Sequence, residues 1–195
     1  MYAFNQLLVL LVARSIQVSL PILLIMQLRN VCWADYGFVS FRPLKDAAIA
    51  LGLTVLCYFA NYALVILLYN LGLDYSGDSN AIPRMTTEAS ISLASILLIM
   101  AASAANGFCE ELAMRSYMIT RLSELYGSKV VAVAATSVFF AAYHIYQGRY
   151  GVIFALVVGL ILGTYFARTK RFWPIAIAHF LMDAYPLSLI AAYSE

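Results

Sequence analysis

The sequence predicts an all-α integral membrane protein, a compact bundle of about six transmembrane helices. Hydrophobic residues make up 64% of the 195 positions and charged residues only 11%, against about 25% in a typical soluble domain. Four stretches contain no Asp, Glu, Lys or Arg, namely residues 47–73, 89–109, 130–148 and 150–167. Since about 20 mostly apolar residues suffice to cross the hydrocarbon core, several segments qualify as spans.

The apolar segments divide the chain into spans and short connections. The predicted spans are residues 4–28, 47–71, 90–108, 129–147, 150–167 and 173–192. Gly, Asp, Asn and Pro between residues 72 and 88 predict the clearest loop. We expect residues 1–195 to form a single transmembrane helical domain, whose chemistry-bearing core covers about residues 90–190.

Lys and Arg alternate between the connections and predict the orientation of the bundle. Connections 29–46, 109–129 and 168–172 each carry three of these residues, whereas 72–88 and the turn at 148–149 carry one each. Because cytoplasmic connections are enriched in Lys and Arg, the three basic connections should face the cytosol. Both termini would then lie on the non-cytoplasmic side.

The net charge of +2 is small and its charges are scattered, which disfavours a nucleic-acid partner. The three cysteines show no ligand-like spacing. Arg14 interrupts the first span and has two readings: it faces the bundle or snorkels, or it has a role near the functional site.

A small set of polar and ionisable residues falls where lipid is expected. Such residues are costly in a bilayer and persist mainly where they have partners or a task. The set includes both histidines of the chain; its members are Asn106, Glu110, Glu111, Arg115, His144, His179 and Asp183.

Helical spacing predicts which of these side chains share a face. Glu111 and Arg115 are four residues apart and should form an ion pair, which leaves Glu110 on another face for other work. His179 and Asp183 have the same spacing, so the carboxylate could orient the imidazole. The pair of Phe140 and His144 places an aromatic ring one turn from the second imidazole.

Depth in the membrane decides whether these groups can meet. If the third span ended at Glu110, that residue would lie at the surface, far from His144. We therefore expect this helix to continue to about Leu122, with a bend at Asn106–Gly107 to accommodate its length. Glu110, both histidines and Asp183 then fall in one layer of the membrane.

A carboxylate and an imidazole that share a water form a general-base arrangement suited to peptide-bond hydrolysis. A second histidine with an acidic partner can polarise a carbonyl or stabilise an oxyanion. Ser116 and Cys109 lie nearby but have no histidine at helical spacing, so the pattern disfavours a covalent nucleophile.

Three motifs occur in order within the apolar segments. Residues 110–115 read EExxxR, residues 140–144 read FxxxH, and residues 179–183 read HxxxD. Together they resemble the CPBP family, which comprises CAAX proteases and bacteriocin-processing (Abi) enzymes. The resemblance covers about residues 90–190.

The resemblance implies a glutamic-type intramembrane endopeptidase. Glu110 would be the base, His144 would hold the same water, and His179 with Asp183 would stabilise the tetrahedral intermediate. Glu111, Arg115, Asn106 and Phe140 would give structural support. The third motif departs from the Asn of eukaryotic prenyl-protein members: an ionised Asp183 cannot donate to an oxyanion, so it must be protonated or act by orienting His179.

The resemblance implies no cofactor and no metal. Nevertheless, Glu110, His144, His179 and Asp183 offer two nitrogen and two oxygen ligands, a set that zinc accepts, although no HExxH is present. A metal therefore stays an alternative at this stage.

Two other classes of function compete with the protease. One is a non-catalytic immunity or scaffold protein of the same fold, and the other is a proton-coupled transporter, although no internal repeat supports it. The expected partners are the lipid bilayer and a peptide or protein precursor, in the plasma membrane of a bacterium or archaeon. The sequence leaves the oligomeric state, the substrate's identity and the cleavage site open.

Overall fold

The computed structural model describes residues 4–72 and 92–193, and the described residues are helical with no β-strand. Helices α1 (Phe4–Leu28), α2 (Pro43–Asn70) and α3 (Leu93–Glu111) come first. A π-helical segment, η2 (Leu112–Ile119), joins α3 to α4 (Thr120–Tyr126). Then follow α5 (Lys129–Tyr143), a 3-10 turn η3 (Ile145–Gln147), α6 (Gly148–Thr169) and α7 (Phe172–Tyr193).

The prediction of an all-helical membrane bundle is confirmed. Five helical segments are long and apolar enough to cross a membrane: α1, α2, the continuous segment Leu93–Tyr126, η3 with α6, and α7. The sixth expected span, α5, is apolar but has only 15 residues. The predicted loop over 72–88 lies, apart from Gly72, outside the described residues.

The third span continues well past Glu110, as the depth argument requires. Helical structure runs from Leu93 to Tyr126 and ends at Gly127, whose φ of 64° lies in the left-handed region that suits glycine. The expected bend at Asn106–Gly107 stays a prediction: α3 is α-helical throughout Leu93–Glu111, and the change to a π-helix begins at Leu112.

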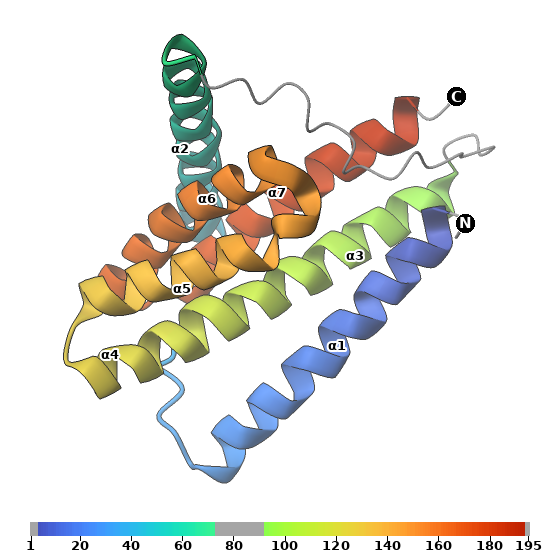
Figure 1. The fold of residues 1–195 in the computed structure, drawn as a ribbon. Coiled ribbons are helices and arrows are strands. Elements are labelled where there is room, and N and C mark those ends of the chain that lie inside the picture. The colour runs from blue at the N-terminus through green and yellow to red at the C-terminus, as the bar shows by residue number, and fades with distance from the viewer. Residues whose placement is uncertain (1–3, 73–91, 194–195) are drawn as a thin grey trace.

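The helices pack as neighbouring pairs, α5 with α6, α3 with α7, α1 with α3, and α2 with α7 (Figure 1). The main hydrophobic core lies among α2, α5, α6 and α7 and includes Phe140, Leu162, Phe166 and Ile175. The first turn of α1 and the last turn of α7 lie at the same end of the bundle (Figure 1). The side of the membrane that this end faces stays a prediction.

Glycine allows α3 to approach α7 very closely. A Cβ placed on Gly107 would lie 2.9 Å from the backbone nitrogen of Phe180 and 3.3 Å from the Cβ of His179. Contacts between real Cβ atoms and their neighbours are essentially never shorter than 3.0 Å, so no other residue fits without displacing α7. This contact places the His179 segment directly against the Glu110–Glu111 segment.

Candidate active site

A buried cluster on α3, η2 and α7 centres on Glu111. Its Oε1 atom lies 2.8 Å from Nη1 of Arg115 and 2.6 Å from Nδ1 of His179. The three side chains are 0%, 1% and 7% exposed, respectively. Because a carboxylate only accepts, Nδ1 of His179 carries the proton and donates it to Glu111. Glu111 therefore fixes the orientation of the imidazole.

Glu110 presents the second carboxylate of the cluster. Its Oε2 lies 3.3 Å from Nε2 of His179, on the other side of the same imidazole ring, and its side chain is 14% exposed. This contact lacks hydrogen-bond geometry, and Oε2 makes no hydrogen bond to any described residue. A buried carboxylate oxygen without a donor needs one, and a water or a substrate N–H group could supply it.

Asp183 faces the same nitrogen from one turn further along α7. Its Oδ1 lies 3.8 Å from Nε2 of His179, whereas its Oδ2 accepts a hydrogen bond of 2.8 Å from Nδ2 of Asn106. Helical spacing predicted that Asp183 could orient the His179 N–H. Nδ1 of His179 instead donates its short hydrogen bond to Glu111, and Nδ2 of Asn106 donates to Asp183.

The predicted span to residue 147 would place His144 within a helix. In the structure α5 ends at Tyr143, so His144 lies just beyond it. It occupies the C-cap position of α5 with φ −91° and ψ 12°. Its Nδ1 lies 2.8 Å from the carbonyl oxygen of Phe140. Since a carbonyl only accepts, Nδ1 carries the proton in the neutral ring, and Nε2 is left with a lone pair for another partner.

Phe140 brings the two imidazoles together. Its ring centre lies 4.5 Å from that of His144 and 6.1 Å from that of His179. The guanidinium carbon of Arg115 lies 4.4 Å from the same ring centre, within the range of a cation–π contact. Phe140 thus contacts His144, His179 and Arg115, and no hydrogen bond or ion pair joins His144 to Glu110 among the described residues.

Tyrosine rings surround the other face of His144. The ring centres of Tyr143 and Tyr146 lie 5.3 and 6.0 Å from that of His144. The guanidinium carbon of Arg14, from α1, lies 5.6 Å from the Tyr143 ring centre. Arg14 is exposed, but its guanidinium lies beside the Tyr143 ring of α5, close to the candidate site. It has no carboxylate within ion-pair distance in the described part of the chain.

Two features of this cluster have no signal in the sequence. Helical spacing pairs Glu111 with Arg115 alone, although the same oxygen also accepts from His179, 68 positions away. Gly107 is also the point of contact between α3 and α7. Helical spacing reports neighbours along one helix and gives no signal for either contact between helices.

The donor set can be compared with a metal site. Within residues 4–72 and 92–193, no group of three His, Cys, Asp or Glu side chains is arranged to bind one metal ion. Two of these side chains form hydrogen bonds within the protein: Nδ1 of His179 donates to Glu111, and Asp183 accepts from Asn106.

Comparison with known proteins bears on the same segment. Residues 92–185 match the family model described as type II CAAX prenyl endopeptidase, Rce1-like. No curated protein and no solved structure matches the chain. The matched region contains every member of the cluster, from Asn106 on α3 to Asp183 on α7.

Proposed function

Because the chain belongs, through residues 92–185, to the CAAX protease (CPBP) family, we propose that it is a glutamic-type intramembrane endopeptidase. Its substrate would be a membrane-associated peptide or protein precursor. The observation that carries the proposal is the Oε2 atom of Glu110, which is buried, lacks a hydrogen bond among the described residues, and lies 3.3 Å from a histidine that Glu111 holds in place.

In the proposed mechanism, Glu110 acts as the general base. It takes a proton from a water molecule whose oxygen attacks the carbonyl carbon of the scissile bond. Nε2 of His144, left with its lone pair by the hydrogen bond at Nδ1, accepts the other O–H of that water and orients it. The C–N bond then breaks, and Glu110 returns its proton to the leaving amine.

His179 and Asp183 are proposed to stabilise the tetrahedral intermediate. In this role His179 is the imidazolium: Nδ1–H donates to Glu111, and the second proton, on Nε2, points toward the oxyanion. Such a donor in a site without bulk water lowers the barrier substantially. An ionised Asp183 cannot donate to the oxyanion. Its proposed role is to hold Nε2 of His179 in position, 3.8 Å away.

Arg115 and Phe140 are proposed to keep this arrangement rigid. Arg115 neutralises Glu111 at 2.8 Å, so that two adjacent carboxylates can exist in a buried setting. Phe140 packs against both imidazoles and against the guanidinium. Neither side chain needs to contact the substrate.

We place the enzyme in the plasma membrane of a bacterium or archaeon, with precursor tails, leader peptides or pheromone precursors as candidate substrates. The chain would be co-expressed with small secreted peptides encoded nearby, and the cleaved ends would be mapped by mass spectrometry. Wild type should cleave at a defined bond, and Glu110→Gln should abolish cleavage while it still inserts. Glu124→Gln, an exposed glutamate on α4, is the matched control. Equal cleavage by wild type and Glu110→Gln would contradict the proposal.

A further inference from the structure

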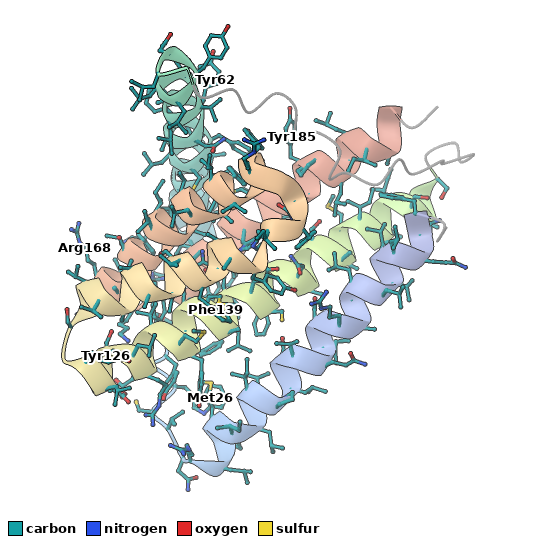
Figure 2. The ribbon with its side chains drawn as sticks, viewed as in Figure 1. Met26, Tyr62, Tyr126, Phe139, Arg168 and Tyr185 are labelled. Carbon is teal, nitrogen blue, oxygen red and sulfur yellow. The ribbon has the colours of Figure 1, made fainter. Side chains whose placement is uncertain are left out.

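A cleft of about 480 Å³ lies at one end of the bundle, and none of its lining residues belongs to the candidate active site. Its walls come from the connection between α1 and α2, from α4 and the start of α5, and from the turn between α6 and α7. Figure 2 shows Tyr126 and Arg168 at this end. Its volume lies within the range of small-molecule sites. The basic connections 29–46, 109–129 and 168–172 all contribute to it.

Two lysines line this cleft. Lys170 is half-buried and donates a hydrogen bond of 2.9 Å from Nζ to Oγ1 of Thr120. Lys129 lines the same cleft and is exposed. Neither ammonium lies within ion-pair distance of a carboxylate in the described part of the chain. Burial, and next the charge of Lys129, lower the pKa of Lys170, and the more distant carboxylates of Asp35 and Glu124 oppose this shift.

The backbone holds Lys170 at this position. The residue has a φ of 48° and a ψ of 45°, the left-handed conformation of a helix C-cap. Its N–H donates 2.8 Å to the carbonyl oxygen of Phe166, and its Nζ lies 5.1 Å from the Phe166 ring centre. A long side chain fixed in this way has already lost much of its conformational entropy, which favours binding of a partner.

Two other polar side chains of the cleft lack a hydrogen bond or an ion pair to the described residues. Oγ of Ser123 is buried and makes no hydrogen bond to any described residue. Asp35, which also lines the cleft, forms no ion pair within the described ranges, whereas Glu124 is paired with Arg121. The cleft thus combines unpaired ammonium groups and a hydroxyl with a separate unpaired carboxylate, which fits a ligand that carries charges of both signs.

Exposed apolar residues are sequence neighbours of the residues that line the cleft. Leu125, Tyr126 and Val130 are 72%, 59% and 79% exposed, respectively, and they alternate along the chain with the lining residues Glu124, Gly127 and Lys129. Tyrosine is enriched at membrane interfaces, and these apolar side chains offer a surface for acyl chains. These side chains favour a membrane lipid over a soluble ion as the occupant.

We propose that this cleft binds the headgroup of a phospholipid that carries both a phosphate and a primary ammonium group. Lys129 and Lys170 hold the phosphate, with Thr120 fixing the Lys170 ammonium, and Asp35 holds the ammonium of the headgroup. The acyl chains lie against Leu125, Tyr126 and Val130. This site is separate from the proposed catalytic cluster, so the assignment does not depend on the proposed function.

The test uses the full chain, purified in detergent and delipidated. Lipid binding is measured by native mass spectrometry with phosphatidylethanolamine, phosphatidylcholine and phosphatidylglycerol. Wild type should retain phosphatidylethanolamine preferentially, because choline has no N–H to donate and glycerol has no cation. Lys129→Gln should weaken its binding by about tenfold, the usual effect of one charge-assisted hydrogen bond.

Two further variants isolate the parts of the headgroup. Asp35→Asn should abolish the preference for phosphatidylethanolamine over phosphatidylglycerol while it leaves phosphate binding in place. Lys45→Gln is the matched control, because this exposed lysine precedes Asp46, which pairs with Arg171 at the same end of the bundle, yet it does not line the cleft. Lys129 and Asp35 are both exposed, so their substitution should leave the fold intact.

The outcomes are distinct. A preference for phosphatidylethanolamine that Lys129→Gln and Asp35→Asn remove, and that Lys45→Gln preserves, supports the assignment. Equal retention of the three lipids by wild type and all variants overturns it. If soluble phosphoethanolamine competes as strongly as the lipid, the assignment of a membrane lipid is overturned.

Discussion

Gly107 lies directly against His179, so that a Cβ on the glycine would come 3.3 Å from the Cβ of the histidine and 2.9 Å from the backbone nitrogen of Phe180. The contact sets the distance between α3, which carries Glu110, and α7, which carries His179. Gly107, which has no side chain, thus determines how closely Glu110 and His179 approach each other.

Gly107→Ala is therefore expected to impair both stability and cleavage. The added methyl group must displace the α7 backbone, and overpacking of this kind costs about 1–3 kcal/mol. Thermal unfolding in detergent and the cleavage rate measure the two effects. Gly52→Ala is the matched control, because a Cβ at this α2 position meets nothing within 4 Å and should be neutral or slightly stabilising. Similar behaviour of the two variants would contradict the packing argument.

Glu110 and Glu111 are expected to respond differently to the same substitution. Glu111→Gln removes the charge that pairs with buried Arg115, and breaking a buried pair costs about 3–5 kcal/mol. Glu110→Gln leaves that pair intact, so it should fold normally and lose only cleavage. Thermal stability and peptide cleavage of both variants, measured side by side, check this. A Glu111→Gln protein as stable as wild type would show that the ion pair is not the structural anchor.

Asp183 is expected to tolerate replacement by asparagine. The amide keeps an oxygen that can accept from Nδ2 of Asn106, and it gains an N–H group that can donate to an oxyanion. Asp183→Asn should therefore retain most of the cleavage rate, whereas Asp183→Leu should lose it. Steady-state kinetics on one peptide would separate kcat from KM. Complete loss of cleavage in Asp183→Asn would mean that the negative charge itself is needed.

Arg14 and Tyr143 are expected to act as a pair. Their cation–π contact at 5.6 Å is worth about 0.5–2 kcal/mol in general, and it adjoins His144. Arg14→Gln and Tyr143→Leu should each lower stability or cleavage modestly, and the double variant should be no worse than either single variant. Tyr143→Phe keeps the ring and should resemble wild type. Additive effects in the double-mutant cycle would show that the two side chains act independently.

The spans could be predicted because a bilayer demands about 20 apolar residues for each crossing, and the chain meets this demand in separated blocks. The first predicted span coincides with α1, Phe4–Leu28, and the last nearly coincides with α7. The end of α5 was predicted too late. Apolar composition continues through Ile145 and Tyr146, and hydrophobicity alone does not reveal that His144 caps the helix through its own ring and the Phe140 carbonyl.

The candidate site could be predicted only within each helix. Spacing correctly paired Glu111 with Arg115, which the structure shows at 2.8 Å. It could not show that Glu111 also reaches His179, because this contact depends on how closely two helices approach. That approach depends on Gly107, whose importance is visible only when α7 is in place. The catalytic roles of these residues stay predictions.

The π-helical segment Leu112–Ile119 also has a consequence for the direction of side chains beyond it. Each residue in a π-helix advances by a smaller angle than in an α-helix, so the phase counted from Glu110 is lost before Thr120 is reached. The continuous helical segment Leu93–Tyr126 can thus direct the Glu110 and Glu111 side chains to the candidate site and the α4 side chains, in another direction, to the lysine-lined cleft. Deleting a single residue between 112 and 119 would shorten the helix only slightly, but it would rotate the side chains of α4 about the helix axis relative to Glu110.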